Sequence, residues 1–232
     1  MGSTETVPFW NMNIPKDQRT EECPDFLQGL HKKDQGILST PDQEYHIFSW
    51  AEVRDIIQTN RLEKFKRVPS ELRRYKAFTF YLKQKYGSIA NFIHEHRLGW
   101  STPLTLRGAP FEFEDDYKIL WNDAPYGVDP RIAHLVVWTK FDLVEDPATG
   151  DLTDKARKEI DDFVTKTFRA HIPEENVLWF RNWHSLQSVN TVQHFHVMLF
   201  NPDPDFVRKV TKGDVPRAGM EVYKYAGCRK RT

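Results

Sequence analysis

The sequence predicts an α+β protein in which an antiparallel sheet with packed helices follows a helical N-terminal region. Two observations lead to this prediction. Between residues 110 and 200, short runs of β-forming residues occur in the order strand–strand–helix–strand–strand, which favours a sheet with helices packed on one side. Before residue 100, apolar residues recur instead at the three- and four-residue spacing of amphipathic helices. A chain of 232 residues is long enough to bury a core.

We divide the chain into four parts. These are an N-terminal arm (1–22), a helical region (23–100), an α+β unit (101–215) and a basic tail (216–232). The boundary near residue 100 lies in a stretch that contains two glycines and two prolines, where the hydrophobic pattern changes.

Local signals mark the expected helices of the N-terminal region. Ser49 and Glu52 stand at the spacing of a capping box, in which each side chain satisfies a free backbone amide at the helix start. Pro69 suits the first position of a helix, where its missing N–H costs nothing, and Gly36 is expected to stop the first helix. The expected helices are 24–36, 50–60, 69–87 and 89–97. We expect no chemistry from this region.

In the α+β unit, two strands joined by a turn-dense connection precede one clear helix. Apolar residues of this helix recur along one face, from Ala156 to Phe168, with charged residues opposite. Two further strands and a short helix follow. The expected strands are 117–121, 133–138, 177–181 and 192–199, and the expected helices are 153–168 and 203–210.

Composition narrows the class of protein. Lysine and arginine together number 33, the same as aspartate and glutamate, so no overall charge attracts nucleic acid or an anionic membrane. No apolar run approaches the roughly 20 residues of a membrane span. Only Cys23 and Cys228 are present, which fits a reducing compartment. We expect a cytoplasmic protein without nucleic-acid or membrane partners.

Two histidines in the last strand are the main candidates for chemistry. Side chains two residues apart in a strand point to the same face, so His194 and His196 project together, beside Val192 and Met198. Imidazole serves as nucleophile, acid, base or metal ligand near neutral pH. The alternative is a pair of hydrogen-bonded structural histidines.

These histidines belong to a longer pattern. A segment with Asn122 is followed by the strand His134–Lys140, and after a helix come Asn182, the run Gln187-Ser188-Val189, and the alternating His194–Val197. This order resembles the histidine-triad superfamily of nucleotide hydrolases and transferases, and it implies a histidine-triad-like sheet. The third alternating histidine of that superfamily is absent here, where Val192 and Met198 flank the pair.

The resemblance implies attack by a neutral histidine on an α-phosphate. The nucleophile would be His194 or His196, with the other histidine orienting it, and His184 would be the acid. Gln187 and Ser188 would donate to the phosphate. The further candidate substrate-binding residues are Asn122, Asp123, His134, Lys140, Arg181 and Asn182. Several also suit ordinary roles, as turn residues or as solvated charges at strand ends.

Over nearly its full length the chain also resembles a fungal family named for N-acetylglucosamine-induced protein 1. The blocks that carry this resemblance are 22–24, 67–75, 107–111, 122–140 and 194–200. It implies a link to amino-sugar metabolism, so a nucleotide or nucleotide-sugar is the expected small-molecule partner, with UDP-N-acetylglucosamine the first candidate. We expect no cofactor.

Two other functions stay open at this stage. A metal-dependent enzyme would bind zinc or another divalent metal through His194 and His196 with His184 or His134. A non-catalytic nucleotide- or sugar-binding protein would retain the pocket without the chemistry.

Overall fold

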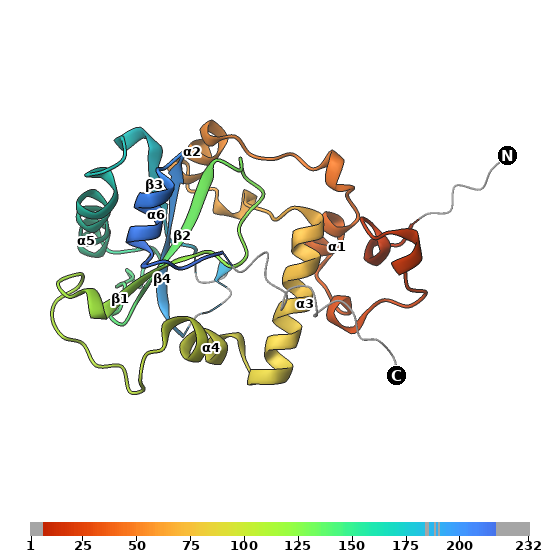
Figure 1. Cartoon of the computed structure of the whole chain (residues 1–232), viewed down its shortest axis with the longest axis horizontal. Helices are drawn as coiled ribbons and strands as arrows, with labels where there is room; N and C mark the ends of the chain where they lie inside the picture. The colour runs from red at the N-terminus through yellow and green to blue at the C-terminus, as the bar shows by residue number, and fades with distance from the viewer. Residues whose placement is uncertain (1–6, 184–185, 188, 190, 217–232) are drawn as a thin grey trace.

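The structure is a computed structural model that describes residues 7–183, 186–187, 189 and 191–216. It confirms the α+β class: the sheet has four antiparallel strands in the order β1-β2-β4-β3. Helices pack on both faces of this sheet (Figure 1), whereas the sequence suggested helices on one side. The strands are β1 (Tyr117–Trp121), β2 (Ile132–Thr139), β3 (Val177–Phe180) and β4 (Gln193–Phe200).

The register of the two central strands sets the position of the histidines. Strand β2 pairs with β4 so that Val136 lies opposite His196 and Trp138 opposite His194. Because side chains alternate along each strand, His134, His194 and His196 project from the same face. We call this the histidine face of the sheet. The prediction that His194 and His196 share a face is confirmed.

The other face carries the main core, which packs against α5 (Asp154–Val164). Thr153 caps this helix, since its hydroxyl accepts a hydrogen bond from the backbone N–H of Ala156 at 3.2 Å. The helix continues as a π-helical turn over Thr165–Arg169, so it covers the range that the sequence predicted. The buried residues of this core include Leu135, Val137, Ile160, Val164, Phe168, Phe195, Val197 and Leu199.

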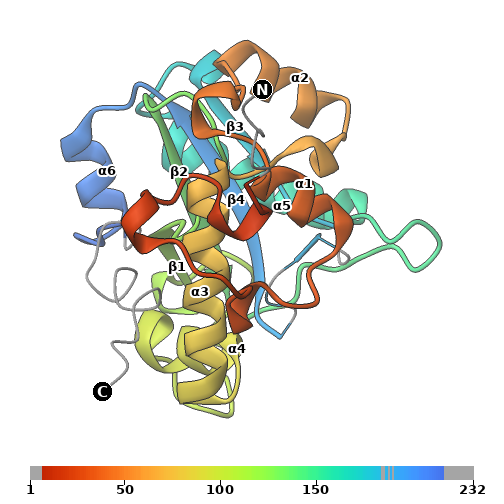
Figure 2. The same ribbon diagram turned by 90° about the vertical axis from the view of Figure 1, so that its right-hand side faces the viewer.

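The N-terminal helices cover the histidine face. They are α2 (Trp50–Gln58), α3 (Pro69–Tyr86) and α4 (Ile89–Phe92), and α4 continues as a π-helical turn over Ile93–Leu98. The expected capping box of Ser49 and Glu52 is present. Figure 2 shows α3 crossing in front of β2 and β4. The helical region therefore shares its hydrophobic cores with the sheet: Phe78, Leu82 and Phe92 pack with Val136 and Trp138, and Val53, Ile56 and Phe65 with Phe180 and Met198.

The first helix differs from its prediction. Helix α1 spans Lys32–Leu38, so Gly36 lies inside the helix and does not end it. Only a 3₁₀ turn, Asp25–Leu27, forms in the first part of the expected range. The last helix, α6 (Pro204–Val210), begins after the capping residue Asp203 as expected. None of the helices in the described parts of the chain is long and apolar enough to cross a membrane.

Candidate functional site

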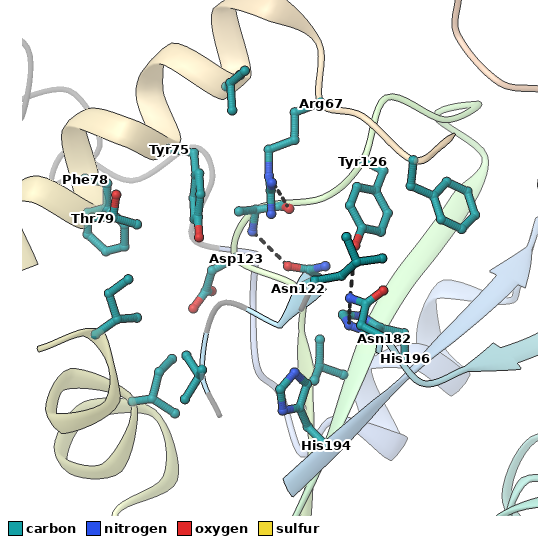
Figure 3. Close-up of a pocket in the computed structure, with 18 of the residues that line it drawn as sticks. Arg67, Tyr75, Phe78, Thr79, Asn122, Asp123, Tyr126, Asn182, His194 and His196 are labelled. Atoms are coloured by element: carbon teal, nitrogen blue, oxygen red, sulfur yellow. Dashed lines mark hydrogen bonds between the residues drawn. The ribbon is translucent and has the colours of Figure 1, made fainter. Parts of the chain in front are cut away.

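A cavity of about 260 Å³ lies between the histidine face and helix α3. The strands contribute His194 and His196 to its wall, and the connection after β1 contributes Asn122 and Asp123. On the opposite side, the helices contribute a largely apolar surface. Figure 3 shows Tyr75, Phe78 and Thr79 of α3 facing the strand residues across this space. The cavity thus combines polar side chains with apolar ones.

A chain of hydrogen bonds fixes His196. The Asn122 side-chain oxygen accepts from the backbone N–H of Ala124 at 3.0 Å, which orients its amide so that Nδ2 donates to Nε2 of His134 at 3.1 Å. The same Nδ2 also lies 3.4 Å from Nδ1 of His134. Because Nε2 of His196 accepts from an amide N–H of Asn182, Nδ1 of His196 carries the proton and donates to Nε2 of His134 at 3.0 Å. Nε2 of His196 in turn accepts from Nδ2 of Asn182 at 3.1 Å.

Both histidines of this chain are kept neutral by burial. Only 3% of His134 and 6% of His196 is exposed. Burial, with the positive charge of Arg67, lowers the pKa of His134 to about 3. Burial and the neighbouring histidines hold the pKa of His196 well below its usual value. Because both ring nitrogens of His196 are engaged, this residue is suited to position its neighbours.

His194 has a different environment. Its Nδ1 lies 2.9 Å from the carbonyl oxygen of Val192, and a carbonyl only accepts, so Nδ1 carries the proton and Nε2 keeps its lone pair. The ring packs on Trp138, with centroids 4.5 Å apart, and points into the cavity (Figure 3). Burial lowers the pKa of His194 to about 4. At neutral pH this is an uncharged imidazole with its basic nitrogen available.

Among the residues that the structure describes, two arginines line the cavity, and their surroundings differ. Arg67 comes from the segment before α3; its Nε donates to the carbonyl oxygen of Ala124 at 3.0 Å, and its guanidinium lies 4.1 Å from the ring centroid of Tyr75 and 5.6 Å from that of Tyr126. Arg97 is buried and ion-paired with Asp123 and Asp214, at 2.9 and 2.7 Å.

The structure brings six of the predicted site residues together. Asn122, Asp123, Asn182, His194 and His196 line the cavity, and His134 lies behind them in the hydrogen-bond chain.

Three predicted residues lie away from the cavity. Lys140 is 3.5 Å from the carboxylate of Asp116, and Arg181 forms an ion pair with Glu145 at 2.5 Å. The side chain of Gln187 donates to the backbone carbonyl of Asn182 at 2.8 Å, so its amide supports the loop. His184 and Ser188 lie outside the described residues.

The two histidines of β4 do not orient each other as the sequence suggested. Their ring centroids are 5.7 Å apart; His196 is held by His134 and Asn182, and His194 by the carbonyl of Val192. Among the residues that the structure describes, no three histidine, cysteine or acidic side chains are arranged to hold a metal ion. The alternative metal set that uses His184 extends beyond those residues.

Sequence reasoning missed Arg67, Tyr75 and Tyr126. All three line the cavity, and two of them come from the helical region for which no chemistry was expected. An arginine before a helix-starting proline carries no local signal of its own. Only the packing of α3 over the histidine face brings it to the site.

Comparison with known proteins places the chain in a family. Residues 49–200 match the family described as "Protein of unknown function (DUF3605)". The chain belongs to this family. All the described cavity residues contributed by the sheet and its loops lie within the matched range, as do Arg67 and Tyr75.

Relatives of this DUF3605 chain occur in yeasts. The N-acetylglucosamine-induced protein 1 of Candida albicans is 32% identical over 72% of this chain and 73% of its own length, which confirms the predicted resemblance. A Saccharomyces cerevisiae protein named "Uncharacterized protein YPL067C" is 28% identical over 81% of this chain and 98% of its own. The crystal structure of HTC1 matches with a TM-score of 0.54 and 26% identity, over 77% of this chain and 92% of that one.

Proposed function

We propose that the cavity binds a small nucleotide or nucleotide-sugar in the cytoplasm and that His194 attacks its phosphoanhydride, in a hydrolase or nucleotidyltransferase reaction. The observation that carries this proposal is the fixed tautomer of His194. Its Nδ1 proton is engaged by the carbonyl of Val192, which leaves the Nε2 lone pair on the cavity side. A nucleophilic imidazole must be neutral at working pH, and burial keeps this one so.

The proposed reaction has two steps. Nε2 of His194 forms a bond to the α-phosphorus while the bridging P–O bond breaks, and the electron pair leaves with the departing phosphate. Water, or a second phosphate in a transfer reaction, then forms a bond to the phosphorus as the P–N bond breaks, and the electron pair of that bond returns to Nε2. When water attacks, its proton passes to the solvent. The carbonyl of Val192 stabilises the positive charge that the ring gains during attack.

The surroundings of His194 favour a phosphoanhydride over a phosphate monoester. A departing phosphate is stable as an anion and needs little protonation, whereas an alkoxide needs an acid beside it. Asp123, a described carboxylate of the cavity wall, is already ion-paired with Arg97. UDP-N-acetylglucosamine is the first substrate to test because a relative is named as induced by N-acetylglucosamine.

A second candidate is a binding protein without turnover. The specific observation in its favour is that Val192 and Met198, at 2% and 0% exposure, are core residues at the positions flanking the histidine pair. A site of this kind would retain the cavity and bind the same ligands.

A ³¹P NMR time course with UDP-sugars and dinucleotides tests the proposal. We expect turnover that survives EDTA, disappears in His194→Ala, and proceeds through an acid-labile phosphohistidine. His171→Ala is the matched control, because His171 also packs on an aromatic ring, Phe206 at 5.1 Å, but is exposed and outside the cavity. Turnover that stops with EDTA would overturn the nucleophile in favour of a metal. Ligand line broadening without turnover would leave the binding protein.

A further inference from the structure

We propose that Arg67 binds the anionic group of the cavity's ligand, in a subsite formed with Tyr75 and Tyr126, and that the ligand joins this anion to an aromatic group. We call these three residues the anion subsite. The inference deepens the proposed function, since it rests on a ligand in the same cavity, but it does not require that His194 react.

The first argument is charge. Arg97 is neutralised by two carboxylates, Asp123 and Asp214. Within the part of the chain that the structure describes, no carboxylate lies within ion-pair distance of Arg67. A permanently charged guanidinium that is half-buried beside a cavity, without a counter-ion, favours an anion there.

The second argument is geometry. The bond from Nε to the carbonyl of Ala124 and the packing on Tyr75 fix the plane of the guanidinium. The bond to Ala124 engages only Nε, so it leaves the two terminal nitrogens, whose parallel N–H groups suit the oxygens of a phosphate or carboxylate. Figure 3 shows the side chain of Arg67 reaching into the space above Asn122, between Tyr75 and Tyr126.

The third argument concerns the rest of the ligand. The helical side of the cavity contributes the rings of Phe78 and Phe92, and β2 contributes the ring of Trp138 beside His194. A flat apolar group gains affinity by displacing water from such a surface. A phosphate ester with an aromatic ring or base therefore fits the cavity better than inorganic phosphate, which contacts the anion subsite alone.

Binding of simple probes tests this inference without any catalytic step. We would titrate the protein with phenyl phosphate, inorganic phosphate and phenol, and follow the ring ¹⁵N signals of His194 and His196. We expect phenyl phosphate to bind at least about tenfold more tightly than inorganic phosphate, because it also buries its ring. Arg67→Gln should weaken phenyl phosphate binding about 10- to 100-fold, the range of a charge-assisted hydrogen bond. Phenol binding should be unchanged.

Two further variants separate charge from structure. Arg67→Lys keeps the charge but loses the two-pronged geometry, and we expect it to recover part of the lost affinity. Arg131→Gln is the matched control: Arg131 also lies over an aromatic ring, Phe200 at 4.7 Å, but it is exposed and paired with Asp129. This control should bind phenyl phosphate as tightly as the unmodified protein.

The outcomes distinguish this inference from the catalytic proposal. Phosphate-ester binding that depends on Arg67, in a protein without turnover, would support the anion subsite and overturn the His194 reaction. If the protein shows turnover, and Arg67→Gln binds phenyl phosphate as tightly as the unmodified protein, the His194 reaction is supported and the anion subsite is overturned. No saturable binding of either phosphate by the unmodified protein would overturn the anion subsite.

Discussion

The Nε2 of His134 on β2 lies 3.0 Å from the Nδ1 of His196 on β4. Because the two strands are paired so that His134 faces Met198, the rings meet diagonally, at the reach expected for side chains one step off a direct cross-strand pair. One nitrogen must donate and the other accept, so this contact exists only while at least one ring is unprotonated. The hydrogen bond between His134 and His196 therefore depends on pH.

We predict that stability falls as the pH drops below about 6.5. The folded protein holds His134 and His194 neutral, with pKa values of about 3 and 4, whereas the unfolded chain protonates them below about 6.5. The unfolded state then binds more protons, so the free energy of unfolding decreases by roughly 1.4 kcal/mol per pH unit for each such histidine. Urea unfolding at pH 7.5 and 5.5 measures this slope.

The control for this prediction is His134→Gln. This substitution removes one titrating group. The slope of the free energy of unfolding against pH should therefore decrease by roughly 1.4 kcal/mol per pH unit, the contribution of one histidine. An equal slope in both proteins would show that His134 does not titrate in this way. The unfolding measurements stay above pH 5 so that carboxylates do not contribute to the slope. Hydrogen bonds to Ser49 lower the pKa of Glu52 to about 2, so this carboxylate gains protons only in stronger acid.

Much of the fold follows from local sequence patterns. The alternation around His194 and His196 predicts β4 and its two faces, because side chains two residues apart in a strand point to the same face of the sheet. The capping box at Ser49 and the proline at 69 predict the starts of α2 and α3, and both are observed. These signals act within a few residues, so they are visible without knowledge of the tertiary structure.

The composition of the site depends instead on long-range packing. Arg67 and Tyr126 are far apart in the chain and meet because α3 lies across the histidine face. The expected substrate ligands Lys140 and Arg181 have the right chemistry, but Asp116 and Glu145 pair with them elsewhere. The tertiary structure determines which acidic residue pairs with each basic residue, so the spacing of residues in the sequence does not predict these pairs.

The contact of Gly127 with Tyr45 predicts a strong effect of a single methyl group. A Cβ at Gly127 would lie 2.5 Å from the Tyr45 ring, whereas one at Gly36 would meet nothing within 4 Å. We expect Gly127→Ala to destabilise the protein by about 1–3 kcal/mol through overpacking. Gly36→Ala, inside α1, should stabilise it by up to about 1 kcal/mol. Thermal unfolding of both variants measures the two signs, and the same sign for both would contradict the contact.

The ion pair between Arg97 and Asp214 should contribute more than surface pairs do. Only 3% of the Arg97 side chain is exposed, and Asp214 also accepts from the backbone N–H of Trp121 at 2.9 Å. Asp214→Asn leaves a buried guanidinium with one carboxylate, and we expect a loss of about 3 kcal/mol. Asp205→Asn breaks an exposed pair with Arg208 and should cost less than about 1 kcal/mol. Equal losses in urea unfolding would show that the buried pair has no special role.

Phe195 tests whether the core opposite the histidine face holds the sheet together. It is fully buried on β4 and packs edge-to-face on Phe163 of α5, with centroids 6.2 Å apart. Phe195→Ala should lose about 3–5 kcal/mol, the cost of removing a buried ring and leaving a cavity. Phe113, which is 39% exposed, is the matched control. The variant Phe113→Ala should lose less than about 1 kcal/mol.

The same Phe195→Ala variant also tests whether the core supports the site. Because Phe195 stands between His194 and His196, a loosened β4 would also disturb the ring signals of both histidines. These signals could also stay unchanged while stability falls. In that case the hydrogen bonds of His196, and the bond from His194 to the Val192 carbonyl, position the two rings independently of the core that packs against α5.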